Sequence, residues 1–82
     1  MANNLDLSII IVSYNTQELL RKCISSIKDK LNSSNIKEEI IVVDNASKDG
    51  SVKIAKEFKT IVIQNKINFG FGKANNQAAK IA

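Results

Sequence analysis

The chain carries three apolar runs that polar segments separate from one another. The runs Leu7–Ser13 and Ile40–Val43 are rich in β-branched residues, and Thr60–Ile63 is a shorter run of the same kind. Such runs, without regular polar alternation, are typical of strands that are covered on both faces, as in a parallel sheet. We therefore predict three buried parallel strands, with Ile40–Val43 in the middle of the sheet.

Helical spacing of apolar residues follows each of these strands. The first predicted helix opens with Asn15 and Glu18 in a capping-box pattern. The apolar stripes of the three predicted helices are, in chain order, Leu19, Leu20, Cys23, Ile24, Ile27 and Leu31; Val52, Ala55 and Phe58; and Phe71, Ala74, Ala78 and Ile81. Alternating strands and helices imply right-handed crossovers, so we predict an α/β fold of β-α-β-α-β-α order, a Rossmann-like three-layer half-domain.

Length and composition limit the class of protein. With 82 residues the chain forms one domain at most, and no segment approaches the roughly 20 apolar residues of a membrane span. The net charge of +4 comes from scattered lysines, without the clustering or interleaved aromatics that a nucleic-acid site needs. Cys23 is the one cysteine and there is no histidine, which excludes an internal disulfide and a usual zinc site and makes Cys23 a predicted core residue. Because Met1–Asp6 lacks signal-peptide features, we expect a cytoplasmic location.

The end of the chain indicates an incomplete domain. The third predicted helix reaches Ala82 without a closing Gly, Asn or Pro, and a sheet of three strands leaves the third as an open edge. We predict that residues 1–82 form a single partial domain, and that a missing C-terminal half or a second copy covers the open edge. Two functions remain open at this point: a part of an enzyme, and a non-catalytic nucleotide-binding or self-assembly module.

Candidate ligand-binding residues follow the strands. Asp44 ends the central strand, where open α/β sheets bind ligands, although capping of the next helix by Asp44 and Ser47 explains the same residues equally well. Tyr14 ends the first strand and can stack on a base while Asp44 accepts a hydrogen bond from a ring N–H or a ribose hydroxyl. Taken alone, Tyr14 is more consistent with a structural residue whose ring is partly buried and whose hydroxyl group is solvated. Glu38 and Glu39 lie at the opposite end of the strand and are predicted to be solvated.

The third loop supplies further candidates. Gly70 and Gly72 permit tight backbone turns, and Lys73 or Lys66 is available to phosphate. A dinucleotide fingerprint requires a glycine-rich turn directly after the first strand, and this chain has Ser13–Thr16 there instead. A receiver-type site is excluded as well, because Gln64 and Asn65 stand where its phosphoacceptor Asp would be.

Three stretches, Ile9–Asn15, Ile41–Ser51 and Asn68–Asn76, resemble the first three motifs of family 2 glycosyltransferases with the GT-A fold. Their order and spacing match, and the resemblance covers the chain from Leu7 to Ala82. The Asp-Asn-Ala-Ser sequence and the Gly-Phe-Gly sequence are most similar to the rhamnosyltransferase-like branch. The resemblance implies a truncated GT-A fold and a UDP- or dTDP-sugar-binding portion of an inverting enzyme that transfers a sugar to a glycan, a lipid or another acceptor.

The resemblance also assigns residues. Those that match Ser13, Tyr14 and Asp44 hold the base and ribose in the family, and those that match Asn68, Gly70 and Asn76 shape the adjoining loop and helix. The full set of nucleotide-binding candidates is Ser13, Tyr14, Asp44, Asn45, Asn68, Gly70, Lys73 and Asn76. Many relatives carry Arg where this chain has Asn75, so the phosphate contacts differ. The divalent cation of the family, Mg or Mn, and the catalytic base belong to strands beyond Ala82, so we assign no catalytic or metal residue and expect the chain alone to be inactive.

Overall fold

The computed structural model describes residues 5–32 and 34–82, and predictions that fall on residues 1–4 or on Ser33 lie outside this part. The elements are β1 (Leu7–Ser13), α1 (Gln17–Asn32), β2 (Glu38–Asn45), α2 (Ser51–Glu57), β3 (Ile61–Asn65) and α3 (Gly70–Ala79). This confirms the predicted order. In the described part, β1 and β3 both pair in parallel with β2, which is therefore the central strand.

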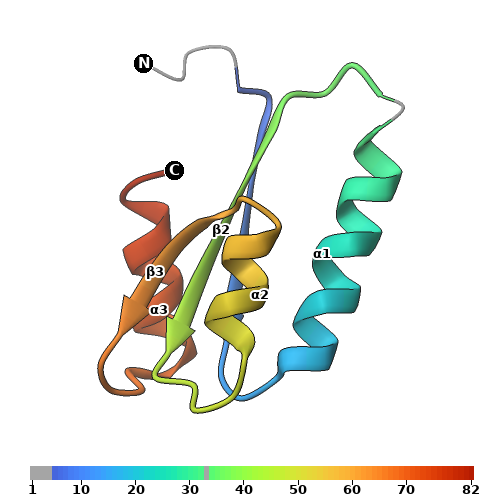
Figure 1. The fold of residues 1–82 in the computed structure, drawn as a ribbon. Helices are drawn as coiled ribbons and strands as arrows, with labels where there is room; N and C mark the ends of the chain where they lie inside the picture. The colour runs from blue at the N-terminus through green and yellow to red at the C-terminus, as the bar shows by residue number, and fades with distance from the viewer. Residues whose placement is uncertain (1–4, 33) are drawn as a thin grey trace.

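The central strand faces two separate cores because successive side chains of a strand point to opposite sides. Ile40 and Val42 pack with residues of α1 and α2 on one face, whereas Ile41 and Val43 pack with Ala74 and Ala78 of α3 on the other. Figure 1 shows the resulting three layers, with α1 and α2 on one side of the sheet and α3 on the other. The unbroken apolar run of β2 is thus explained by burial on both faces.

Two predicted stripes are wider than the faces that the helices bury. On α1, Leu20 and Ile24 are buried, but Leu19 is 67% exposed and Cys23 is exposed, so the prediction of Cys23 as a core residue is wrong. Both residues lie about 100° around the helix from the buried positions and therefore miss the sheet. On α3 the prediction fails similarly for Phe71, which is 70% exposed. The inner face of this helix is formed instead by the small side chains of Ala74 and Ala78, which let α3 lie close to the sheet.

The edges of the sheet also differ from the expectation. Within the described residues, β3 is an edge as predicted, but β1 is equally an edge because the strand order is β1-β2-β3. Leu7 of β1 and Ile61 of β3 are partly exposed apolar residues on these two strands. None of the helices in residues 5–32 and 34–82 has the length and hydropathy to span a membrane.

The strand ends bring polar residues together. Ser13 of β1 pairs in register with Asp44 of β2, and Asn45 of β2 pairs with Asn65 of β3. All three strands run in the same direction, so the loops that follow them gather at one end of the sheet, at the bottom of Figure 1. The carboxyl end of the sheet is therefore the place to look for a site.

Candidate functional site

Asp44 is the most unusual residue at this end of the sheet. Its side chain is 1% exposed, and its Oδ2 atom accepts a hydrogen bond of 2.9 Å from the Ser47 backbone N–H. Its Oδ1 atom is closed to solvent and has no hydrogen-bond partner among the residues that the structure describes. Leaving a buried acceptor unsatisfied costs about 1–3 kcal/mol, more for a charged group, which makes this oxygen a candidate acceptor for a ligand donor.

The alternative role of Asp44 and Ser47 as caps of the following helix is wrong. Helix α2 begins at Ser51, beyond the reach of either residue, and Gly50 at its N-cap makes no side-chain capping bond. Asp44 instead closes a turn onto Ser47, whose Oγ atom accepts a hydrogen bond of 2.8 Å from the Asn15 backbone N–H. At the start of α2 it is the Oδ1 atom of Asp49 that accepts a hydrogen bond from the Ser51 N–H.

Asn15 does not form the predicted capping box with Glu18, because its side chain is used elsewhere. Its Oδ1 atom accepts a hydrogen bond of 2.7 Å from the Lys48 backbone N–H, across the gap between the first and second loops. Its backbone has φ of 50°, and Ala46 in the second loop has φ of 66°. Residues other than glycine adopt this left-handed conformation at a cost of about 1–2 kcal/mol, and such strain persists only where surrounding contacts impose it.

The two loops are joined at a second point by Gln17. Its backbone N–H donates to Asp49 Oδ2 at 3.1 Å, and its Oε1 atom accepts a hydrogen bond of 2.9 Å from the Gly50 N–H. A Cβ atom at position 50 would lie 3.0 Å from that same Oε1, so a larger residue there would require the Gln17 side chain to shift. The first two loops therefore form one rigid unit that carries Tyr14 and Asp44, and the exposed Tyr14 ring stands at its surface with 48% of its area accessible.

Hydrogen bonds also lower the pKa of Asp49. The Ser51 hydroxyl donates to its Oδ1 atom at 2.6 Å, and the backbone N–H groups of Ser51 and Gln17 add further donors that favour the charged form. Because the folded pKa is below that of the unfolded chain, the charged carboxylate adds stability at pH values above the unfolded pKa of about 3.9. That contribution is lost as the pH falls through the folded pKa.

We expect this loss to be visible in the Asp49→Asn variant. The difference in unfolding free energy between the wild type and the variant should stay constant at neutral pH and shrink once the pH falls below about 4. Urea unfolding at a series of pH values measures the difference. Asp29→Asn, which removes a carboxylate from exposed α1, is the control for charge alone. A difference that stays constant down to about pH 2 would contradict the assignment.

The third loop is tied to the end of β2. Asn45 is 2% exposed and its Nδ2 atom donates to the Gly70 carbonyl oxygen at 3.3 Å, while the Gly70 N–H donates to Asn68 Oδ1 at 2.7 Å. Gly70 has φ of 82°, which fits the predicted tight turn. Gly72 does not, since it lies within α3 without a positive φ. The structure thus brings Ser13, Asp44, Asn45 and Gly70 to one end of the sheet.

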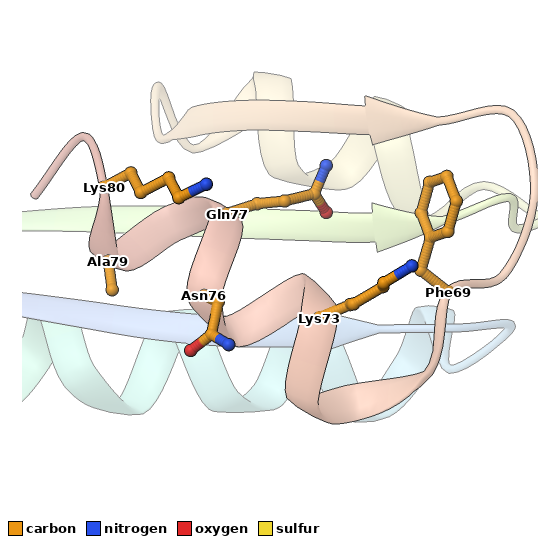
Figure 2. Close-up of a pocket in the computed structure, with 6 residues that line it drawn as sticks. All are labelled: Phe69, Lys73, Asn76, Gln77, Ala79 and Lys80. Carbon is orange, nitrogen blue, oxygen red and sulfur yellow. The ribbon is translucent and has the colours of Figure 1, made fainter.

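Lys73 and Asn76 lie farther along α3. Lys73 places its Nζ atom 5.6 Å from the centre of the Phe69 ring, a cation–π contact that Figure 2 shows. Both residues line a groove of about 620 Å³ on the outside of the helix. Asn76 and Gln77 point to opposite sides of α3 in the same view. A second groove, of about 560 Å³, lies between the second and third loops and contains Lys48 and Lys66.

Sequence reasoning missed two residues of this region, Asn65 and Gln77. Asn65 ends β3, and Gln77 lies on the inner side of α3 between the buried residues Ala74 and Ala78. The signals were available: Asn65 follows an apolar strand as Asp44 does, and Gln77 lies three positions after Ala74 on the same helical face. Their amides are joined by two hydrogen bonds, of 2.8 Å and 3.0 Å.

The donor set does not fit a metal ion. Across residues 5–32 and 34–82, His, Cys, Asp and Glu nowhere gather in a group of three that could hold one. Asp49 accepts local N–H donors with both carboxylate oxygens, and Asp44 at the end of β2 accepts one with Oδ2.

Known proteins with this sequence pattern transfer sugars. The family model described as "Glycosyl transferase family 2" matches residues 8–82. Glycosyltransferase AglE of Haloferax volcanii is 40% identical over 53 residues, which are 65% of this chain and 17% of that protein. Poly(ribitol-phosphate) beta-glucosyltransferase of Bacillus spizizenii is 37% identical over 93% of this chain and 13% of its own length. The chain thus spans less than a fifth of these relatives.

A solved structure shares the fold. The mannosyltransferase PcManGT of Pyrobaculum calidifontis, in complex with GDP-Man and Mn²⁺, superimposes with a TM-score of 0.72 at 23% identity. The match covers 93% of this chain and 24% of that protein, so the three strands and three helices correspond to a Rossmann-like part of a larger GT-A fold. With the family model matched from Ser8 to Ala82, the chain belongs to glycosyl transferase family 2.

Proposed function

We propose that this chain is the nucleotide-sugar-binding portion of an inverting glycosyltransferase that uses a UDP- or dTDP-sugar. The observation that carries the proposal is the buried Asp44 carboxylate, whose Oδ1 atom lacks a partner among the described residues. A ring N–H or a ribose hydroxyl would satisfy that oxygen. The exposed ring of Tyr14, which follows the register partner of Asp44 in β1, would stack on the base. Because Oδ1 is closed to solvent, binding requires a small movement of the groups around it.

Sugar transfer itself is assigned to residues that this chain does not contain. Inverting transfer needs a carboxylate that deprotonates the acceptor and a cation that stabilises the leaving diphosphate. The relatives are several times longer than this chain, and PcManGT holds Mn²⁺ together with GDP-Man. We propose that the base and the cation site belong to that additional length, and that a C-terminal half or a second copy covers an open edge of the sheet. The 82-residue chain alone is then inactive.

An NMR titration with three nucleotides tests which base the site prefers. Amide NMR spectra of the chain are recorded during titration with UDP, dTDP and GDP in the presence of magnesium. GDP is included because the structural neighbour binds GDP-Man. With the sugar and most diphosphate contacts absent, we expect a dissociation constant near 1 mM, or about 4 kcal/mol. Shifts should be confined to Ser13, Tyr14, Asp44 and residues 68–73, and should be larger for UDP and dTDP than for GDP.

Pyrophosphate is the matched control in this titration. It carries the same charged groups as the nucleotides but has no base for Tyr14 and no ribose for Asp44. If pyrophosphate reproduces the UDP shifts, binding reflects only the net charge of +4 and the proposed site is wrong. If a well-dispersed spectrum ignores all three nucleotides, the non-catalytic assembly module becomes the better account, and sedimentation at increasing concentration then tests self-association. The rhamnosyltransferase-like branch stays a prediction.

A further inference from the structure

A network of three carboxamides lies behind the candidate site. Asn65 Nδ2 donates to Asn45 Oδ1 at 2.9 Å and to Gln77 Oε1 at 2.8 Å, and Gln77 Nε2 donates back to Asn65 Oδ1 at 3.0 Å. Asn45 Nδ2 then donates to the Gly70 carbonyl at 3.3 Å. Both N–H groups and the oxygen of the Asn65 amide are therefore used. A fully satisfied network of this kind has one arrangement in which every donor meets an acceptor.

The network joins the ends of two paired strands to the helix that packs against them. Asn45 ends β2, Asn65 ends β3, and Gly70 and Gln77 lie two turns apart on α3. The helix is thus held at its first residue and again in its last turn. In Figure 2 the Gln77 side chain extends from α3 toward the carboxyl end of the sheet, where the strand arrows end. Two attachments along one helix fix its direction as well as its distance from the sheet.

Apolar packing alone would hold α3 less specifically. The helix places Ala74 and Ala78 against Ile41 and Val43 of the sheet, and alanine side chains offer little shape to resist sliding. Hydrogen bonds are directional, so a slide of α3 along the sheet would break the pair between Asn65 and Gln77. Burial makes that loss costly, since Asn45 is 2% exposed and Asn65 is 8% exposed.

We propose that Asn65 and Gln77 are positioning residues that set the place of the third loop relative to Asp44. The path is short: Gln77 orients Asn65, Asn65 orients the Asn45 amide, and Asn45 holds the Gly70 carbonyl. Gly70 in turn is bonded to Asn68, the other loop residue assigned to the nucleotide. This positioning role rests on the proposed nucleotide-binding function. Neither Asn65 nor Gln77 contacts the nucleotide in this proposal.

The test uses Gln77→Met in the whole chain, which keeps the length of the side chain and removes its amide. Gln64→Met is the matched control, because it makes the same substitution at an exposed position beside Asn65. Ile24→Val is the control for stability, since it weakens the core on the opposite face of the sheet. Backbone ¹⁵N relaxation at Asn68 and Gly70 is measured without ligand, and UDP affinity is measured at a temperature at which every variant is fully folded.

We expect Gln77→Met to increase the motion of the Asn68 and Gly70 amides and to weaken UDP binding by about fivefold, the equivalent of one hydrogen bond. Gln64→Met should change neither quantity, and Ile24→Val should lower only the unfolding midpoint. If Gln77→Met lowers the midpoint yet leaves the loop amides and the UDP affinity unchanged, the network is merely structural and the proposal is wrong. If Gln77→Met does not fold, Gln77→Glu replaces it, because it keeps the acceptor for Asn65 but turns the donor into a charged oxygen that faces Asn65 Oδ1.

Failure of the proposed function gives a different result. In that case the wild type shows no UDP-specific shifts, so affinity cannot distinguish the variants, and a nucleotide-positioning role is overturned with the function itself. Unchanged relaxation at Asn68 and Gly70 overturns the inference even when the wild type binds UDP. A loss of order at both amides together with weaker binding, in the variant alone, supports it.

Discussion

Replacing Asp44 with asparagine is expected to weaken UDP binding by at least about tenfold while the chain stays folded. A hydrogen bond to a charged acceptor contributes about 1.5–3 kcal/mol, and 1.4 kcal/mol is a factor of ten in affinity. Asparagine retains an oxygen for the Ser47 N–H, so the turn that Asp44 closes is kept. The other oxygen is replaced by an NH₂ group, which cannot accept a hydrogen bond from a base or a ribose.

In Asp44→Asn the unfolding free energy should not fall together with the affinity for UDP. The Oδ1 atom of Asp44 is buried without a partner in the described part of the chain, and a neutral amide is less costly to bury than a carboxylate. We therefore expect the unfolding free energy of Asp44→Asn to be equal to or higher than that of the wild type. Loss of affinity without loss of stability is the pattern of a binding residue, since sites commonly retain groups that the fold alone would not favour.

The measurement is the same NMR titration, run beside a urea unfolding curve for each variant. Asp29→Asn removes one negative charge from exposed α1 and is the control for the general increase in positive charge. Equal UDP affinity in Asp44→Asn and the wild type would reject Asp44 as a ligand residue. A large loss of stability in Asp44→Asn would show instead that the carboxylate serves the turn at Ser47.

The second large effect concerns the fold. Ile24→Ala is expected to lower the unfolding free energy by about 2–5 kcal/mol, because it leaves a cavity where α1 meets the sheet. Ile24 is 0% exposed and packs in the core with Ile40, Val42 and Ile54. A domain of this size has a total stability of about 4–12 kcal/mol, so the substitution removes a large fraction of it.

Leu19→Ala is the matched control for Ile24→Ala, because it shortens a large apolar side chain in the same helix at a position that is 67% exposed. We expect it to change the unfolding free energy by less than about 0.5 kcal/mol. Circular dichroism during urea titration measures both variants. Equal destabilisation by the two substitutions would mean that α1 does not pack as described.

Hydrogen bonds join the three loops at the carboxyl end of the sheet to one another. The first and second loops are joined through Asn15, Gln17 and Asp49, while the second and third are joined through Asn45 and Gly70. The contacts between all three loops are hydrogen bonds between residues of the chain itself.

The sequence by itself determined the elements, their order and the place of the candidate site. Four consecutive β-branched or aliphatic residues in Ile40–Val43 required a strand buried on both faces, and the alternation of strands with helices required a parallel sheet. Asp44 followed directly, because the end of a parallel strand is fixed once the strand is fixed. These inferences depend only on the spacing of apolar residues along the chain, which is a reliable signal of strands and helices.

The tertiary structure alone decided which side of each helix is buried and which polar residues meet. Leu19 and Cys23 are apolar like core residues but lie outside the contact between α1 and the sheet. The apolar stripe of a helix does not show how much of its surface the sheet covers. Likewise, Asn45, Asn65 and Gln77 are up to 32 positions apart in the sequence and meet only because two strands and a helix pack together. Hydrogen bonds between such distant amides depend on distances in space, and those are set by packing and not by local pattern.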